Sequence, residues 1–128
     1  GDSSLAAIKD FSGRPGIDVV MVHGGYEWRR STAADQRRIY RSLVDAGVEI
    51  VLGAHPHVLQ GMEYYRNGLI YYSLGNFLFN GMQEMPYAEE TIIAEFGIID
   101  SKILYRSETP VQDPSSPGRR TQKLSKGF

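Results

Sequence analysis

Hydrophobic and polar positions follow two different patterns along this chain, and the first pattern alternates continuous apolar runs with helical periodicity. The runs "IDVVMVH" at 17–23 and "VEIVLG" at 48–53 are short, uninterrupted and rich in β-branched residues, which is typical of strands buried on both faces of a sheet. Between them, Thr32 and Asp35 form an acceptable capping box for a helix that Gly47 ends. The apolar side chains that recur at helical spacing in that segment are Ile39, Tyr40, Leu43, Val44 and Ala46. This order of strand, helix and strand predicts a βαβ unit, in which the strands pair in parallel through a right-handed crossover.

The second half of the chain changes to the patterns of antiparallel strands. The run "VLQGMEYYRNGLIYYSLGNFLF" places Asn67 and Gly68 between two β-rich stretches, which is a strong hairpin signal. "TIIAEFGIID" and "KILYRSE" flank Asp100 and Ser101 and predict a second antiparallel pair. Residues 1–16 predict a short amphipathic segment and a Gly/Pro loop, and residues 110–128 an irregular tail rich in Pro, Ser and basic side chains. The predicted fold class is therefore α/β, a βαβ unit followed by antiparallel hairpins.

Composition narrows the class of protein without identifying it. The chain has 128 residues, 41% of them apolar, which suffices for one modest domain or for part of a larger one. A net charge of −1 gives no electrostatic footprint for nucleic acid or an anionic membrane. No apolar run approaches the roughly 20 residues of a membrane span, and the absence of cysteine excludes disulfides, thiolate metal sites and cysteine nucleophiles. Because the chain begins with Gly1 rather than Met, we expect it to be a piece of a longer protein.

All three histidines of the chain follow the apolar runs that predict strands, and all lie near glycines. His23 ends the first run, and His55 and His57 flank Pro56 just after the second. Reactive groups gather at the carboxyl ends of parallel strands, and a βαβ unit makes these two ends neighbours. We therefore expect the three imidazoles to converge.

Pro56 is expected to shape this group of histidines. It disfavours the helical region for His55 and so favours an extended backbone, in which residues i and i+2 project to the same side about 6.5 Å apart. Such a separation suits two metal ions at the roughly 3.5–4 Å spacing of binuclear hydrolytic sites. Gly24, Gly25 and Gly53 allow sharp turns and leave room for ions or a phosphate.

Metal binding is the hypothesis that the histidine pattern favours, although a single histidine at a strand end is more often a structural residue. Imidazoles suit zinc, iron, manganese or nickel and do not choose among them. Three histidines alone can form a mononuclear site, whereas a binuclear site also needs oxygen ligands. Glu27, four residues after His23, can orient a histidine, act as an acid or base, or be a solvated loop residue. The other nearby carboxylates are less well placed, because Asp18 begins its strand and Asp35 caps the helix.

Other polar residues near these motifs have both a functional and a structural interpretation. Asn76 interrupts the apolar pattern of "YYSLGNFLF" and can ligate a metal, hydrogen-bond a histidine or occupy a turn or bulge. Arg29 and Arg30 can clamp an anionic substrate, but adjacent arginines usually form a solvated surface. Glu63 can point back across the hairpin toward the His-Pro-His segment. These alternatives stay open on sequence alone.

Three motifs, in this order and spacing, carry a family resemblance: "HGGYEW" at 23–28, "GAHPHVLQGMEYY" at 53–65 and "YYSLGNFLF" at 71–79. They resemble the bacterial CapA-type capsule-synthesis family, the poly-gamma-glutamate biosynthesis domain of the calcineurin-like metallophosphoesterase superfamily. The resemblance covers residues 17–108. It implies the C-terminal portion of a four-layer metallophosphoesterase-like sandwich, to which we assign residues 1–109.

The resemblance also implies roles for the matching residues. His23 and His55 would bind one divalent metal ion and His57 the other, with Mn, Fe or Zn as the two ions of a complete domain. Glu27 is the candidate catalytic residue. The groups expected to support the ligands or to face the substrate are Asn76, Gly24 and Gly25.

Some features of the family pattern are changed or missing. The family's usual His-Trp-Gly-x-Glu-Tyr has Gly24 in the place of the Trp and Trp28 in that of the Tyr, and its Gly-His-His-Pro-His is Gly-Ala-His-Pro-His at 53–57. The superfamily's earlier motifs, an Asp at the first strand, a bridging Asp and an Asn-His pair, have no match here. We therefore expect half of a binuclear site, completed by an N-terminal half that was removed or lies on a separate chain, and no efficient hydrolysis by this chain alone.

By the same resemblance, the expected function is metal-dependent, phosphoesterase-like hydrolysis in capsule polymer synthesis or export. Such proteins are usually membrane-anchored or extracytoplasmic at the bacterial cell surface. The expected partners are the N-terminal half, capsule synthesis or export proteins and an anionic polymer. One alternative is a non-catalytic module that binds an anionic polymer or assembles a synthesis complex, and another is a histidine site of purely structural use.

Overall fold

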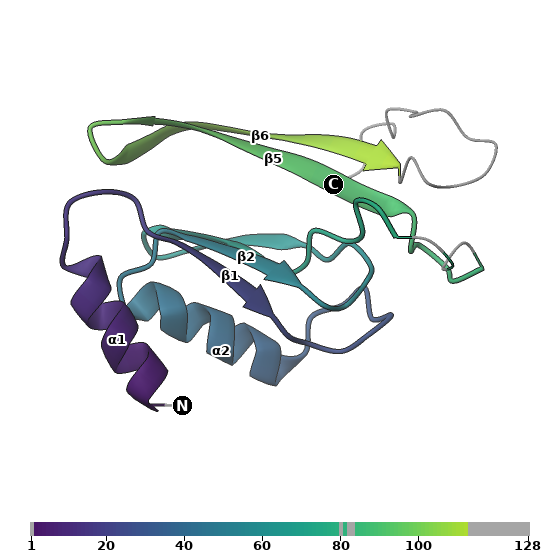
Figure 1. Ribbon diagram of the computed structural model, residues 1–128, viewed down its shortest axis with the longest axis horizontal. Helices are drawn as coiled ribbons and strands as arrows, with labels where there is room; N and C mark the ends of the chain where they lie inside the picture. The colour runs from purple at the N-terminus through teal and green to yellow at the C-terminus, as the bar shows by residue number, and fades with distance from the viewer. Residues whose placement is uncertain (1, 80, 82–83, 113–128) are drawn as a thin grey trace.

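The computed structural model describes residues 2–79, 81 and 84–112, which form helices and strands in the order shown in Figure 1. The elements are α1 (Asp2–Ser12), β1 (Val19–His23), α2 (Ala34–Asp45), β2 (Ile50–Ala54), β3 (Met62–Tyr65), β4 (Gly68–Tyr71), β5 (Glu90–Ile99) and β6 (Lys102–Gln112). This order confirms the α/β class, with a βαβ unit followed by antiparallel hairpins. Strand β6 continues through Gln112, past the start of the tail expected at 110–128, and residues 113–128 lie outside the described residues.

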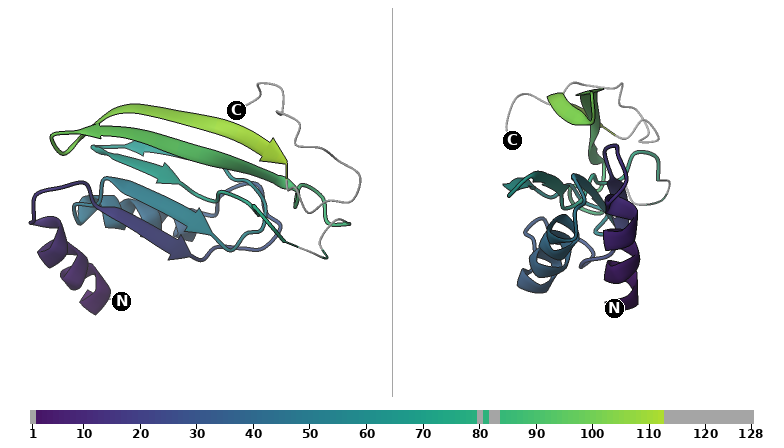
Figure 2. Two further views of the ribbon diagram at one scale, coloured as in Figure 1. Left: turned by 45° about the horizontal axis from the view of Figure 1, so that its top comes forward. Right: turned by 90° about the vertical axis from the view of Figure 1, so that its left-hand side faces the viewer.

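The described elements are arranged in layers (Figure 1, Figure 2). A sheet of strand order β1-β2-β4-β3 lies in the middle, with α1 and α2 on one face and the β5–β6 hairpin along the other. Strands β1, β2 and β4 are parallel, and β3 returns antiparallel beside β4. Among the helices of residues 2–79, 81 and 84–112, none is long and apolar enough to cross a bilayer.

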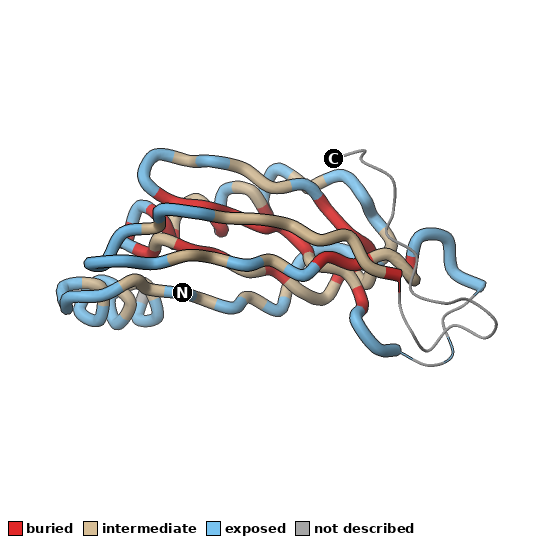
Figure 3. Tube along the Cα trace, turned by 90° about the horizontal axis from the view of Figure 1, so that it is seen from above, coloured by how far each residue is buried: buried red, intermediate tan, exposed pale blue. Residues whose placement is uncertain are grey.

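Two apolar clusters hold the layers together, and Figure 3 shows how burial concentrates along the central strands. The cluster between the helices and the sheet contains Tyr40, Leu43, Val44, Val48, Val51, Ile70 and Tyr72. The cluster between the sheet and the hairpin contains Leu59, Leu69, Tyr71 and Ile92. Full burial of each such side chain contributes roughly 1.5–3 kcal/mol. The central strands β2 and β4 are therefore the most firmly held part of the sheet, and they lead directly into the candidate site.

Strand β1 is not buried on both faces, contrary to the expectation from its continuous apolar run. Val20 and Val22 pack against the helix-side cluster, but Val19 and Met21 are 50% and 76% exposed. The expectation was wrong because β1 is an edge strand, and the hairpin packs over β2, β4 and β3 instead. A run of apolar residues does not reveal the position of its strand in a sheet.

Helix α2 begins differently from the predicted capping box of Thr32 and Asp35. Its N-cap is Ala33, whose backbone N–H donates to Gln36 Oε1 at 3.4 Å. The Thr32 hydroxyl oxygen accepts from the Arg37 guanidinium at 2.9 Å instead. The capping box was misplaced because a glutamine side chain serves the helix start here. The predicted stop is confirmed, since Gly47 follows the C-cap with a φ of +114°.

Both predicted hairpins are present. Asp100 and Ser101 connect β5 to β6 with φ values of +50° and +59°, the left-handed pair that a type I′ turn requires. In the β3–β4 hairpin Tyr65 pairs with Gly68, so its turn residues are Arg66 and Asn67. This turn lies one position earlier than the Asn-Gly signal suggested.

Gly53 allows a close approach between β2 and the chain that leaves β4. A Cβ at Gly53 would lie 2.1 Å from the carbonyl oxygen of Tyr72 and 2.9 Å from the ring of Tyr40. Beyond this point Leu74 N–H donates to the Gly53 carbonyl at 3.0 Å. The absence of a side chain at Gly53 therefore lets the segment after β4 run beside the end of β2.

We expect Gly53→Ala to lower the free energy of unfolding by about 3 kcal/mol, because the new methyl group would force backbone atoms apart. Gly61→Ala is the matched control: no atom lies within 4 Å of a Cβ built there, and we expect a change of at most about 0.5 kcal/mol. Urea denaturation of the two variants and the wild type measures both effects. Equal stability of the two variants would contradict the close approach as a constraint.

Candidate metal centre

The predicted site lies where β1 and β2 end side by side. The parallel register pairs His23 with Ala54, so the loop after β1 and the turn after β2 start from adjacent positions. Backbone hydrogen bonds join the two segments, because Gly24 N–H donates to Ala54 O at 3.0 Å and Trp28 N–H donates to Pro56 O at 2.9 Å. The parallel pairing therefore brings both motif segments to one edge of the sheet.

The backbone turns sharply from His55 to His57 and is not extended. These residues have φ values of +98° and +60°, in the left-handed region that side chains other than glycine rarely adopt. The expectation of an extended backbone was wrong: Pro56 does keep His55 out of the right-handed helical region, but the chain reverses direction there. The two imidazole centroids nevertheless lie 6.0 Å apart, so the side chains remain neighbours.

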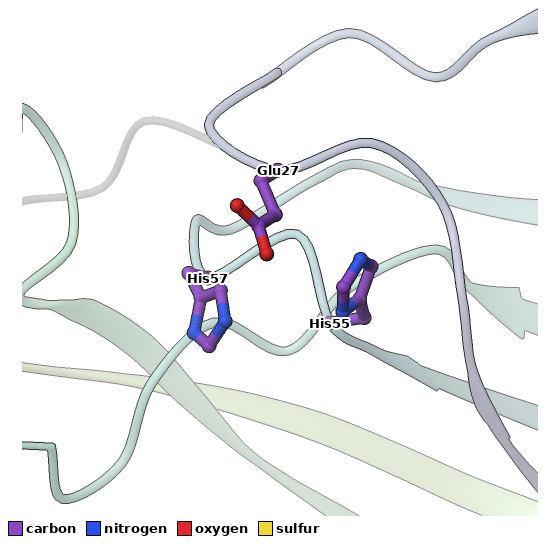
Figure 4. A group of neighbouring side chains, drawn as sticks. All are labelled: Glu27, His55 and His57. Atoms are coloured by element: carbon purple, nitrogen blue, oxygen red, sulfur yellow. The ribbon is translucent and has the colours of Figure 1, made fainter.

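Glu27, His55 and His57 form a group of potential metal ligands (Figure 4). One carboxylate oxygen and one nitrogen of each imidazole all lie within 4.8 Å of one another, and the Glu27 carboxylate points between the two rings. Both histidines are half-buried, whereas Glu27 is exposed. His23 lies beside this group, with its ring centroid 4.9 Å from that of His55. Imidazole and carboxylate donors together suit Mn, Fe or Zn.

Asn76 holds the ring of His57 in one orientation. Its Nδ2 donates to the carbonyls of His57 and Ala88 at 3.0 and 3.1 Å, so Oδ1 is the atom that lies 3.0 Å from His57 Nδ1. Because an amide oxygen only accepts, Nδ1 must carry the proton, and the neutral ring keeps its lone pair on Nε2. Of the three interpretations of Asn76, the structure therefore has the hydrogen bond to a histidine, the arrangement typical of residues that support metal ligands.

Two aromatic side chains pack on the same imidazole. Trp28 stacks on His57 with centroids 5.2 Å apart and planes at 21°, and Phe79 meets the ring edge-on at 5.2 Å. Sequence reasoning pointed to neither contact. The one available signal was the position of Trp28 directly after Glu27, but an aromatic residue does not reveal which ring it will contact.

The two glycines expected near the substrate occupy the start of the same loop. Gly25 has a φ of +118°, and a Cβ there would lie 3.0 Å from Gln36 Nε2. Gly24 accepts a hydrogen bond from the Tyr40 hydroxyl at 3.4 Å, and only a Val22 methyl group at 4.0 Å approaches a Cβ built there. The geometry therefore requires glycine at position 25 more strictly than at position 24.

The neighbouring charged residues are engaged elsewhere. Arg30 forms an ion pair with Glu90 at 3.5 Å and lies over the ring of Tyr87, and Arg29 lies over the ring of Tyr26 at 5.4 Å. These contacts fit the surface interpretation of the two arginines.

Glu63 does not point toward the His-Pro-His segment. Its carboxylate binds Arg41 at 2.6 Å and accepts a hydrogen bond from the Tyr72 hydroxyl at 2.6 Å. The hydrogen bond from Arg41 holds the pKa of Glu63 below its ordinary value, and that from Tyr72 acts in the same direction. Burial is the main cause that raises the pKa of Tyr72, followed by its hydrogen bond to Glu63. These three side chains tie α2 to β3 and to the chain after β4.

Comparison with known proteins gives one family match and several relatives. The model of the family described as "Bacterial capsule synthesis protein PGA_cap" matches residues 2–81. "Capsule biosynthesis protein CapA" of Bacillus anthracis is 32% identical over 115 residues, which are 89% of this chain and 28% of that protein. "PGA biosynthesis protein CapA" of Bacillus subtilis (strain 168) is 45% identical over 64 residues, 50% of this chain and 17% of that protein. The chain thus spans between about a sixth and about a quarter of the length of these relatives.

We expect Arg41→Gln to reduce stability near neutral pH and to lose this effect in acid. The folded-state pKa of Glu63 lies below its unfolded value, so the stabilisation is present above the unfolded pKa and is lost as pH falls through the folded pKa. The free energies of unfolding of variant and wild type, measured from pH 7 into acid, should begin to approach each other below the unfolded pKa of about 4.3 and converge as pH falls through the lower folded pKa. Arg38→Gln, an exposed arginine of the same helix, is the control. A deficit that stays constant with pH would contradict the assignment.

Proposed function

The chain belongs to the family of bacterial capsule synthesis proteins, and on this premise we propose that it supplies part of the metal site of a phosphoesterase-like hydrolase. The observation that carries the proposal is the convergence of Glu27, His55 and His57 within 4.8 Å. The hydrogen bond from His57 Nδ1 to Asn76 supports it, because it leaves Nε2 as the free donor atom.

Each residue has a defined part in this proposal. His55 and His57 each hold one of two divalent ions, Mn, Fe or Zn, and His23 adds an imidazole from the end of β1 to the ion of His55. Glu27 ligates the ion or acts as an acid or base toward the substrate. Asn76 keeps His57 in the metal-binding tautomer, and the loop at Gly24 and Gly25 faces the substrate. When bound, the ion supplies the Lewis acidity for attack of water on a phosphoester.

A binuclear site needs more oxygen ligands than these residues offer. We therefore assign residues 1–109 to the C-terminal part of a larger metallophosphoesterase-like domain. In this proposal its remaining metal ligands belong to the N-terminal half of that domain. The short share of the relatives' length that this chain covers, 28% and 17%, is consistent with that assignment. The proposal includes two ions in the complete domain, with His57 on one and the other histidines on the second.

The capsule family also guides the proposed cellular role. We place the complete protein at the bacterial cell surface, extracytoplasmic or membrane-anchored, in the synthesis or export of a capsule polymer. Its proposed partners are capsule synthesis or export proteins and an anionic polymer such as poly-gamma-glutamate. A bound polymer carries many carboxylates, which are themselves ligands for hard divalent ions.

We expect the chain to bind one divalent ion and to lose it on substitution of the cluster. Calorimetric titration with Mn²⁺, Fe²⁺ and Zn²⁺ measures the affinity, and saturating ion should raise stability by about 2.7 kcal/mol at a hundred times Kd. His55→Ala should weaken binding at least ten-fold, because it removes a direct ligand. Glu63→Gln is the control, since that carboxylate binds Arg41 instead. Wild-type affinity in His55→Ala, or no binding of any of the three ions, would contradict the site.

We expect hydrolysis only from the longer protein that carries this sequence. That protein should hold two ions by elemental analysis and hydrolyse bis-p-nitrophenyl phosphate, whereas the present chain should hold at most one ion and show no turnover. Two ions without turnover on any phosphoester would contradict the hydrolase. A function as a non-catalytic module that binds an anionic polymer would then be tested by sedimentation with poly-gamma-glutamate.

A further inference from the structure

A chain of amide hydrogen bonds runs from the start of α2 to the loop that carries Glu27. Ala33 N–H donates to Gln36 Oε1 at 3.4 Å, Gln36 Nε2 donates to Gln60 Oε1 at 2.8 Å, and Gln60 Nε2 donates to the Arg29 carbonyl at 2.6 Å. Gln36 and Gln60 are only 3% and 4% exposed, so water does not compete for these bonds. The sequence pointed to neither glutamine as a site residue.

The donor-to-acceptor direction of this series of hydrogen bonds is fixed at both ends. The Ala33 N–H can only donate and the Arg29 carbonyl can only accept, so each glutamine amide has one allowed orientation. Gln36 Nε2 also donates to the Tyr72 carbonyl at 3.3 Å, which would be left facing an oxygen if the amide were reversed. Because an unsatisfied buried polar group costs about 1–3 kcal/mol, the pair of glutamines is held in a single state.

Glu27 depends on its backbone for its position. Its side chain is exposed, so packing does not hold the carboxylate near the imidazoles. The surrounding loop is fixed by the backbone bonds of Gly24 and Trp28 to the histidine turn and, after Glu27, by the bond of Gln60 to Arg29. Trp28 between them has a φ of +63°, a conformation that persists only where neighbouring contacts impose it. The Gln60 bond adds a side-chain hydrogen bond from the segment after His57 to this anchoring.

We propose that Gln60, oriented by Gln36, is a positioning residue that sets the separation between the Glu27 carboxylate and the imidazoles of His55 and His57. Through that separation it sets the affinity of the cluster for a divalent ion. This inference rests on the proposed metal site and extends it to two residues that are not themselves ligands. Figure 4 shows why the separation needs such control, because Glu27 and the two histidines come from different segments of the chain.

The test compares Gln60→Met with Glu49→Met. Methionine keeps most of the side-chain volume but lacks the amide group, so both the hydrogen-bond donor and the acceptor of Gln60 are lost. Glu49 is a matched control because its Oε2 accepts from the Asp18 N–H at 2.8 Å. This side-chain bond joins the residues just before β1 and β2, at the end of that strand pair away from the site. Calorimetric titration with Zn²⁺ should show a Kd raised about 10- to 100-fold in Gln60→Met and an unchanged Kd in Glu49→Met. Gln36→Met should shift the Kd in the same direction by a smaller factor.

A second measurement is independent of metal. Trp28 is the single tryptophan of the chain and stacks on His57, so its fluorescence reports on the loop. Acrylamide should quench Trp28 more strongly in metal-free Gln60→Met than in the wild type or in Glu49→Met.

The two measurements separate failure of the inference from failure of the proposed function. An unchanged Kd in Gln60→Met, or an equal loss of affinity in Glu49→Met, overturns the positioning role while the metal site stands. If the wild type binds no Zn²⁺, the proposed metal site fails, and acrylamide quenching alone decides whether Gln60 holds the loop. Unchanged quenching of Trp28 in Gln60→Met then overturns the inference. Increased quenching shows that Gln60 holds the loop in place, although not for a metal ion.

Discussion

The parallel ladder between β1 and β2 pairs Val19 with Ile50 at one end and His23 with Ala54 at the other. A slip by one residue would move every β1 side chain to the opposite face, because side chains alternate along a strand. The helix-side cluster opposes such a slip, since Val20 and Val22 pack against it while Met21 is left in water. The histidines are therefore brought together by a register that burial on one face of β1 enforces.

The other layers support this edge of the sheet from two sides. On the helix side, Tyr40 stacks on Tyr72 at 5.3 Å and its hydroxyl reaches the Gly24 carbonyl. On the hairpin side, Thr91 of β5 donates to the Leu74 carbonyl at 2.7 Å, next to the segment of Asn76. Apart from His23 at the end of β1, the residues of the site therefore lie in loops. These loops are held between a helix and a hairpin, which apolar burial elsewhere stabilises.

The sequence predicted the parts of the structure that depend on local pattern. The βαβ unit, the two hairpins and the stop at Gly47 follow from periodicity and from turn residues. The convergence of the histidines follows from the rule for strand ends. The predictions that failed depend on contacts between distant parts of the chain. The exposed face of β1 depends on strand order, and the left-handed turn at His55 depends on hydrogen bonds from the loop after β1. The roles of Gln36 and Gln60 were hidden for the same reason, because a glutamine carries no sign of which distant carbonyl it will bind.

The left-handed backbone at Trp28, His55 and His57 has a consequence for how such a site persists. Side chains other than glycine cost roughly 1–3 kcal/mol in that region, and three of them lie within one small cluster. Glycine at any of these positions would relax the backbone while deleting an imidazole or an indole. A library screened for heat resistance alone would therefore drift toward glycine here and erase the donor atoms. Selection for a more stable fold and selection for the ligands therefore act in opposite directions at these positions.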